Sequence, residues 1–194
     1  MSGLKSDLRK ALLARRRAIP RTVRAAATRR IAATVNSLRQ FKPGSRVALY
    51  ASFGSEFNPA QIARAARRRG IDLYVPVVVD LPRRRMRFVA WSAAIKPGIE
   101  RTRSNVASLR FIPARWFNLI LLPIVGIDAD GHRLGMGAGF YDRALAFRRL
   151  RRHWKGPHLI ALGFDCQRVE QTHAQAWDAR VDALITESGL HHFP

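Results

Sequence analysis

The chain has 194 residues, of which 47% are hydrophobic, so it is long and apolar enough to bury one sizeable core. The single cysteine, Cys166, excludes an internal disulfide and suits a reducing compartment. No apolar run reaches the length of a membrane span, and no apolar signal core follows the first basic residues, so we expect a cytoplasmic protein.

The first segment is predicted to be an amphipathic helix. Leucines recur every fourth residue from Leu4 to Leu12, which is the spacing of one helical face. At 100° per residue, Lys5, Arg9 and Arg16 fall within about 40° of one another. The helix therefore presents an apolar stripe to a core and a positively charged stripe beside it.

Beyond Pro20, helical and strand patterns alternate along the chain. Helical spacing covers residues 23–41, 59–69 and 139–152. Apolar runs typical of strands cover residues 46–52, 73–79, 86–91, 117–125, 158–164 and 181–186, whereas residues 92–114 have no clear pattern. This alternation predicts a three-layer α/β/α sandwich with a mainly parallel sheet, formed by one domain over residues 1–194.

The most informative segment follows the apolar run at residues 117–125. A polar turn is followed by three alternating glycines, Gly135, Gly137 and Gly139, just before a helical pattern. Such glycines let the backbone approach a ligand closely, and free N–H groups before a helix suit an anion. The spacing is neither that of the dinucleotide fingerprint nor that of a P-loop. We interpret the segment as a phosphate-binding loop, with a plain structural turn as the alternative.

Charged residues on both sides of the glycines favour the phosphate interpretation. Arg133 precedes them, and a guanidinium group can chelate a phosphate. Asp142 follows them, and a carboxylate at the edge of a phosphate site suits Mg²⁺. The sequence therefore predicts a phosphate ligand with a magnesium ion beside it.

The string GHRLGMGAGFYDRALA, residues 131–146, resembles a motif of the 5-formyltetrahydrofolate cyclo-ligase family. The family pattern is G-x-R-L-G-x-G-x-G-Y-Y-D, and the chain departs from it only at Phe140. Further blocks match the family in order, namely residues 5–9 with Arg16, 50–52 with Glu56, 162–167, and 178–182 with 186–187. The resemblance spans almost the whole chain and implies a sandwich of the NagB/RpiA/CoA-transferase type.

The resemblance implies an ATP-dependent reaction with a Mg²⁺ ion. The family cyclises 5-formyltetrahydrofolate to 5,10-methenyltetrahydrofolate and releases ADP and phosphate, so ATP and the folate, which can carry a polyglutamate tail, are the expected partners. Lys5 and Arg9 are expected at the ATP phosphates, with Arg16 as a weaker candidate. The expected ATP loop comprises Arg133, Leu134, Gly135, Met136, Gly137, Ala138, Gly139, Phe140 and Tyr141.

The same resemblance assigns the substrate and the metal. Ala51 and Glu56 match the folate contacts, and a carboxylate suits the paired N–H donors of an aminopterin ring. Loop residues are also expected to face the folate, namely Met136, Gly137, Ala138, Gly139 and Phe140. Asp142 and Asp178 match the magnesium positions. An ordinary surface charge is the alternative for Glu56, for Asp178 and, within a run of three arginines, for Arg16.

Two other functions stay open. The formal net charge is +22, and residues 1–42 contribute half of it, which makes a nucleic-acid-binding protein the runner-up. No zinc spacing, RNP-like strand or clear helix-turn-helix supports that function, and nucleic acid is not an expected partner. Residues 102–113 lack the family's Glu-Pro element, and Phe140 lacks a hydroxyl, so a family member with an altered substrate is the second alternative.

Overall fold

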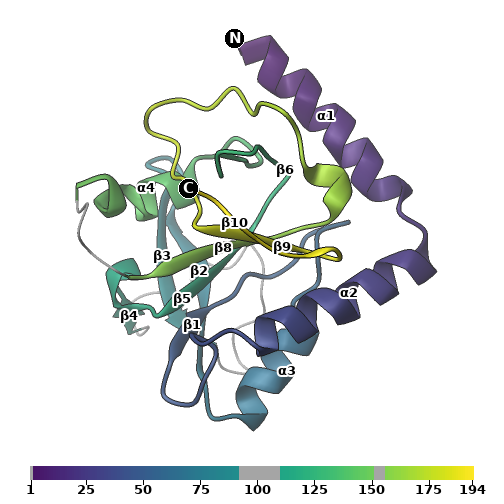
Figure 1. The fold of residues 1–194 in the computed structure, drawn as a ribbon. Coiled ribbons are helices and arrows are strands. Elements are labelled where there is room, and N and C mark those ends of the chain that lie inside the picture. The colour runs from purple at the N-terminus through teal and green to yellow at the C-terminus, as the bar shows by residue number, and fades with distance from the viewer. Residues whose placement is uncertain (1, 92–109, 151–155) are drawn as a thin grey trace.

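The computed structural model describes residues 2–91, 110–150 and 156–194 (Figure 1). The helices are α1 Ser2–Ala18, α2 Arg21–Asn36, α3 Ala60–Arg68 and α4 Phe140–Ala144, with short 3₁₀ turns η2 Ala114–Trp116, η3 Ala146–Leu150 and η4 Asp165–Gln167. The strands are β1 Arg46–Ala48, β2 Asp72–Asp80, β3 Arg85–Ala90, β4 Phe111–Ile112, β5 Leu119–Pro123, β6 Gly126–Ile127, β7 Arg133–Leu134, β8 His158–Leu162, β9 Ala183–Thr186 and β10 Gly189–His192.

Within these ranges, eight strands form one sheet in the order β10-β9-β8-β5-β1-β2-β3-β4, and β6 pairs with β7 as a separate ribbon. The strands from β9 through β2 in that order run parallel to their neighbours. Antiparallel pairing is confined to the two edges, where β10 joins β9 and where β3 and β4 follow β2. The predicted α/β fold with a mainly parallel sheet is confirmed.

Both faces of the sheet are buried, as the uninterrupted apolar run of β5 predicts. Leu119 and Leu121 pack on the face covered by α2 and α3, whereas Ile120 and Leu122 pack on the opposite face. That opposite face is covered by apolar side chains from α4 and η3 together with loop residues. Figure 1 shows α2 and α3 on one side of the sheet and α4 on the other.

The second helical layer is thinner than the sequence predicts. Of the helical pattern predicted at residues 139–152, the described residues form one α-helical turn, α4, and then the 3₁₀ turn η3, and residues 151–152 lie outside the described part of the chain. Arg148 in η3 binds both carboxylate oxygens of Asp182 at 2.7 and 2.8 Å and also donates to the carbonyl of Pro157 at 2.7 Å. These bonds hold the second turn against the strands, because they tie its side chain to two neighbouring segments.

The carboxyl-terminal residues form a further strand that the sequence does not predict. His191 and His192 belong to β10, the antiparallel edge strand, although no apolar run marks it. His191 Nε2 lies 3.0 Å from Ser188 Oγ, which helps to close the turn before β10. Of residues 92–114, which have no clear pattern, residues 92–109 lie outside the described part of the chain.

Helix α1 packs mainly through its carboxyl-terminal half. Leu12 is fully buried with Val125 and Leu134, beside the β6/β7 ribbon, while Leu4 is 59% exposed. The predicted apolar stripe therefore contacts the core at its carboxyl-terminal end, whereas the first turn of the helix lies near solvent. None of the described helices is long and apolar enough to cross a membrane.

The loops that follow β1, β5 and β8 carry the residues singled out in the sequence. The loop after β1 holds Glu56, the β6/β7 ribbon after β5 leads into the glycines, and η4 after β8 holds Gln167. Parallel strands end at the same edge of a sheet, which is where ligands bind in open α/β folds. The fold therefore brings these three segments to one edge, with α1 packed on η4 beside them.

Candidate active site

The glycine loop connects β7 to α4 and is open to solvent. Gly137 and Gly139 have φ angles of +95° and +69°, a backbone region that favours glycine over other residues. Met136, Gly137 and Ala138 are exposed, so a ligand can reach the loop backbone. Because α4 has only five residues, its dipole adds little to anion binding. Neutralising a phosphate here depends on side chains.

Two cations of α1 contact the loop and the segment beside it. Arg9 Nε donates to the carbonyl of Gly135 at 2.8 Å, and a Cβ atom on Gly137 would lie 3.5 Å from Arg9 Nη2. Lys5 Nζ lies 3.0 Å from Asp178 Oδ2. The positively charged stripe predicted for the first helix therefore faces the glycine loop and the segment around Asp178.

Arg133 is buried under the other side of the loop. Its Nη2 donates to Asp142 Oδ1 at 2.7 Å, and its guanidinium group stacks on the ring of Tyr141 with 5.3 Å from Cζ to the centroid. The Arg133 Nε atom is buried and has no acceptor among the described residues. A buried donor without a partner is costly, and an oxygen-bearing ligand would satisfy it.

The two acids predicted to bind metal lie side by side, although 36 residues separate them in sequence. Asp142 Oδ1 accepts the N–H of Ala179 at 3.2 Å, which places Asp142 next to Asp178. Among the described residues, no hydrogen bond reaches Asp142 Oδ2 or Asp178 Oδ1. Two carboxylates that each keep a free oxygen suit Mg²⁺, which binds one or two carboxylates together with phosphates and water.

Glu56 lies in the loop after β1, with the half-buried Ala51 five residues before it. Its Oε2 accepts the N–H of Phe53 at 2.9 Å. Burial raises the pKa of the Glu56 carboxyl above its ordinary value, and the hydrogen bond from Phe53 and the charge of Arg16 act in the opposite direction. The Glu56 carboxyl is therefore partly withdrawn from water.

The remaining loop residues divide into exposed and buried positions. Leu134 is buried against α1 with Leu12, so its side chain supports the loop from below. Met136 is 58% exposed, and Phe140 and Tyr141 are half-buried at the start of α4. The predicted ATP loop thus has a packed base at Leu134 and an open middle.

Arg16 is a buried structural residue and not an exposed charge. It is 4% exposed, its Nε donates to Ser55 Oγ at 3.0 Å, and its Nη1 donates to the carbonyl of Ile124 at 3.0 Å. Arg16 therefore joins the loop after β1 to the end of β5. This position corrects the alternative that placed it in solvent among its two arginine neighbours.

Sequence reasoning missed Tyr50 as part of the site. Its hydroxyl donates to the carbonyl of Phe57 at 3.0 Å, which closes the loop that holds Glu56. Burial raises the pKa of Tyr50, and also that of Tyr141, and the nearby charge of Glu56 raises both further. Two signals covered Tyr50, the strand pattern at residues 46–52 and the family block at residues 50–52, but neither distinguished it from a core residue.

Gln167 also has a structural role. It is 1% exposed, its Nε2 donates to the carbonyls of Ile124 and Val125 at 2.7 and 3.0 Å, and its Oε1 accepts the N–H of Phe164 at 2.9 Å. All of these partners are backbone atoms. Gln167 therefore fixes η4 to the end of β5 and supports the edge on which the site lies.

The chain is similar over most of its length to proteins of one enzyme family. The model of the 5-formyltetrahydrofolate cyclo-ligase family matches residues 1–187. A 5-formyltetrahydrofolate cyclo-ligase of Haemophilus influenzae is 27% identical over 157 residues, covering 77% of this chain and 80% of the relative. That of Mycolicibacterium smegmatis is 31% identical over 158 residues, covering 73% of this chain and 74% of the relative.

Solved structures support the same fold. A 5,10-methenyltetrahydrofolate synthetase of Aquifex aeolicus superposes with a TM-score of 0.78 at 26% identity, covering 97% of this chain and 92% of that one. The enzyme of that name from Mycoplasma pneumoniae gives a TM-score of 0.74 at 22% identity, which shows similarity of fold. With the family model matching nearly the full length, the chain belongs to the 5-formyltetrahydrofolate cyclo-ligase family of enzymes.

Proposed function

We propose that this chain uses ATP and Mg²⁺ to cyclise 5-formyltetrahydrofolate to 5,10-methenyltetrahydrofolate through the residues gathered at the glycine loop. The observation that supports this best is the pairing of two cations with two carboxylates there, Lys5 with Asp178 and Arg133 with Asp142. Relatives that carry the cyclo-ligase and synthetase names support the same substrate and product.

The reaction replaces a poor leaving group with a good one. The formyl oxygen attacks the γ-phosphorus of ATP, so an O–P bond forms, the bond to ADP breaks, and an iminophosphate results. N10 of the folate then attacks the formyl carbon, and the C–O bond breaks as phosphate leaves with that oxygen and takes up the proton that N10 loses. The protein needs to align the two substrates, neutralise phosphate charge and exclude water.

The ion pairs at the loop are suited to an exchange of partners when ATP binds. Asp142 and Asp178 would hold Mg²⁺ through carboxylate oxygens, and the ion would neutralise phosphate charge. Lys5 and Arg133, released from their acids, would then bind phosphate oxygens. Each cation and each carboxylate keeps an opposite charge beside it both before and after binding, so neither state leaves a half-buried charge unpaired.

Glu56 is proposed to orient the folate. An ionised carboxylate can accept two parallel N–H bonds from the aminopterin ring, which fixes the ring in one direction. Burial raises the pKa of Tyr50 and of Tyr141, and the charge of Glu56 adds to both shifts, which supports a folate position between the loop after β1 and the start of α4. That position would bring the formyl group toward the glycine loop.

The test is the appearance of the methenyl-folate absorbance band with purified protein. Product is expected only when ATP, Mg²⁺ and 5-formyltetrahydrofolate are all present. Two results would favour the altered-substrate alternative. One is a folded protein that hydrolyses ATP without forming product. The other is a protein that acts on other one-carbon folates but not on 5-formyltetrahydrofolate. Residues 102–109, where the Glu-Pro element is missing, lie outside the described part of the chain.

A further inference from the structure

Two arginines from different helices hold the residue that precedes Glu56. Arg16 of α1 is 4% exposed, and its Nε donates to Ser55 Oγ at 3.0 Å. Arg24 of α2 is half-buried, and its Nη1 donates to the carbonyl of Ser55 at 2.7 Å. Ser55 is therefore held once through its side chain and once through its backbone.

Both arginines are themselves fixed to the ends of central strands. Arg16 Nη1 donates to the carbonyl of Ile124 at 3.0 Å, and Arg24 Nη2 donates to the carbonyl of Arg16. The guanidinium group of Arg24 lies over the ring of Phe164, 5.1 Å from Cζ to the centroid. Because Ile124 follows β5 and Phe164 follows β8, the two arginines tie Ser55 to the carboxyl-terminal edge of the sheet.

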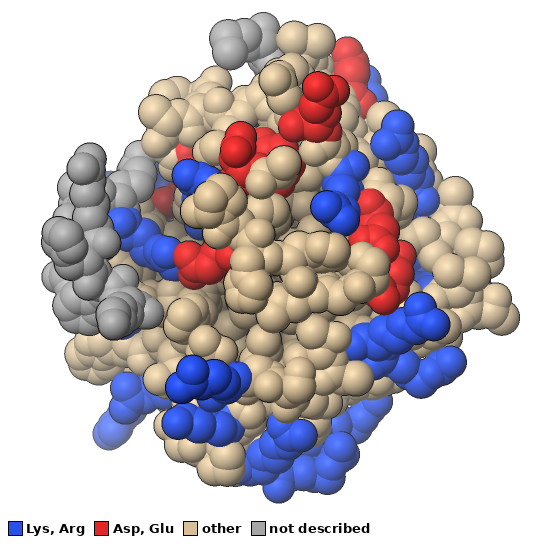
Figure 2. Space-filling view, viewed as in Figure 1, with Lys and Arg blue, Asp and Glu red and all other residues tan. Residues whose placement is uncertain are grey.

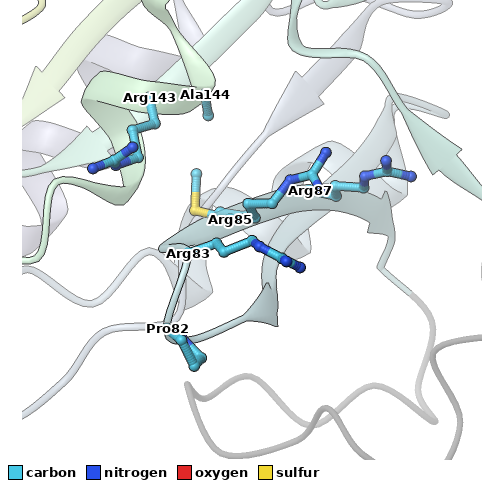
Figure 3. A pocket seen from close by; sticks show the side chains of 7 residues that line it. Pro82, Arg83, Arg85, Arg87, Arg143 and Ala144 are labelled. Carbon is cyan, nitrogen blue, oxygen red and sulfur yellow. The ribbon is translucent and has the colours of Figure 1, made fainter.

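Other arginines of the chain keep their guanidinium groups open. Four of them line a pocket of about 610 Å³ between α4 and the β2/β3 hairpin, namely Arg83, Arg85, Arg87 and Arg143. In Figure 3 these side chains point in different directions. Arg16 and Arg24, by contrast, each donate two hydrogen bonds to backbone or hydroxyl acceptors of this chain. These two arginines therefore act on the protein's own loop.

The bonds within the loop after β1 do not connect it to the helices. The N–H of Glu56 donates to the carbonyl of Phe53 at 3.2 Å, and Glu56 Oε2 accepts the N–H of Phe53 at 2.9 Å. These bonds join loop residues to one another, whereas the two arginines join the loop to α1 and α2. A carboxylate that accepts two parallel N–H bonds depends on its direction as well as its distance, so it needs such external support.

Arg16 also acts on the ionisation of Glu56. Burial raises the pKa of the Glu56 carboxyl, and the hydrogen bond from Phe53 and the charge of Arg16 lower it. Burial raises the pKa values of Tyr50 and Tyr141, and the charge of Glu56 raises them further, so both hydroxyls are neutral where a carboxyl titrates. Arg16 therefore favours the ionised carboxylate, which is the form that accepts paired N–H bonds.

We propose that Arg16 and Arg24 are positioning residues of the folate site, which fix Ser55 and thereby aim the Glu56 carboxylate at its ligand. The proposal rests on the proposed function, because it takes Glu56 as the residue that binds the folate ring. A guanidinium group is suited to this task, because it can donate to two segments at once from separate nitrogens, whereas a lysine has a single nitrogen.

Arg24→Gln tests the position of Glu56 without altering α1, the helix of Lys5 and Arg9. It should raise the KM for 5-formyltetrahydrofolate about fivefold and change that for ATP less than about twofold, as expected for a lost charge-assisted bond that acts only through the folate loop. Ser55→Ala, which removes the hydroxyl acceptor, should give the same pattern. Arg29→Gln, at an exposed position of α2, is the matched control and should change neither KM. Equal changes of the two KM values in Arg24→Gln, or no change, overturn the proposal.

Variants of Arg16 separate position from charge. Arg16→Lys keeps the charge but cannot bridge Ser55 and Ile124, so the KM for the folate should rise while the pH at which folate affinity falls stays near that of the wild type. Arg16→Gln also removes the charge, so the pKa of Glu56 should rise and the acidic loss of affinity should move to higher pH. Identical pH profiles of the two variants overturn the assignment of Arg16.

Hydrogen exchange of the ligand-free protein separates this proposal from the proposed function. Amide exchange at residues 53–57 should be about fivefold faster in Arg24→Gln and in Ser55→Ala than in the wild type, and exchange in α4 should be unchanged. Unchanged exchange at residues 53–57 overturns the proposal even if the wild type forms product. Faster exchange in a protein that binds no folate supports the hold of the arginines on the Glu56 loop and contradicts the proposed function instead.

Discussion

Near the glycine loop, each of two ion pairs joins a cation expected at the ATP phosphates to an acid expected at the metal. Lys5, expected at ATP, is paired with Asp178, expected at the metal, and Arg133 is paired with Asp142 in the same way. A cation and an acid that neutralise one another can be separated if the cation binds phosphate and the acid binds the metal, as proposed. Because the cation and the acid of each pair have different expected ligands, single substitutions can test their roles separately.

Lys5→Ala and Arg9→Ala should each raise the KM for ATP about tenfold, and raise that for the folate much less, because a lost charge-assisted contact to phosphate costs roughly this factor. Steady-state kinetics with each substrate varied in turn measures the difference. Lys10→Ala is the control, since Lys10 lies on the same helix but pairs only with the exposed Asp7. Unaltered ATP dependence in Lys5→Ala would make α1 a packing element alone.

Asp142→Asn and Asp178→Asn should each lower the rate and shift the Mg²⁺ requirement to higher concentration. The effect of Asp142→Asn should be the larger, because Asp142 directly follows the glycine loop. Asparagine keeps one oxygen acceptor for the bonds that each acid receives, so thermal stability should change little. Titration of activity with Mg²⁺ is the measurement, with the exposed Glu170→Gln as control. A midpoint that Asp178→Asn does not move would return Asp178 to the surface-acid interpretation.

Glu56→Gln should raise the KM for the folate about tenfold and leave that for ATP nearly unchanged, since a neutral amide loses the charged acceptor of the paired bonds. Burial raises the pKa of Glu56, so acidification protonates this carboxyl at a higher pH than an ordinary glutamate. The folate affinity of the wild type should therefore fall as the pH decreases toward that raised value. In Glu56→Gln this acidic loss should be absent, and a variant that retains the wild-type pH profile would place the titrating group elsewhere.

At the scale of elements, the sequence predicts what depends on local pattern and misses what depends on distant partners. The buried run of β5 and the leucine spacing of α1 are visible in any window of the chain. The change from α4 to the 3₁₀ turn η3 after Ala144 goes with the contact of Arg148 with Asp182, and β10 depends on pairing with β9. The position of Asp142 beside Asp178 was predicted through family resemblance, because no local pattern joins residues so far apart.

Helix α1 supplies two of the predicted ATP-binding cations, Lys5 and Arg9, and Leu12 is its most buried side chain among the described residues. Leu12→Ala should lower the free energy of unfolding by about 3 kcal/mol, because it leaves a cavity at a fully buried position. It should also raise the KM for ATP, since Lys5 and Arg9 lose their fixed position. Leu4→Ala, at a position 59% exposed, is the matched control and should change neither quantity much. Thermal unfolding and ATP kinetics on both variants decide whether packing of α1 and nucleotide binding are coupled.

At the scale of the whole molecule, the positive charge is unevenly distributed. Figure 2 shows acidic side chains in the upper part of the view and a mostly basic lower part, where α2 and α3 lie in Figure 1. Neither of these two helices contains an acidic residue. This basic surface lies on the face of the sheet opposite α4. Its field attracts anions in general, and the two anionic substrates benefit from that at low salt.

Because this field attracts polyanions, the runner-up function, nucleic-acid binding, has to be tested directly. A short RNA or duplex oligonucleotide should bind the protein in dilute buffer and dissociate as salt rises, because counterion release dominates such contacts. At physiological salt we expect a Kd weaker than about 1 μM, in the range of non-specific binding.

The double variant R30Q/R64Q should weaken the low-salt binding, because it removes two charges of the basic surface. It should leave the KM for ATP at physiological salt unchanged. Fluorescence anisotropy across a salt series gives both the affinity and its slope. Binding that stays tighter than micromolar and depends on oligonucleotide sequence would mean that α2 and α3 form a true nucleic-acid site, and that the charge of this chain serves more than its substrates.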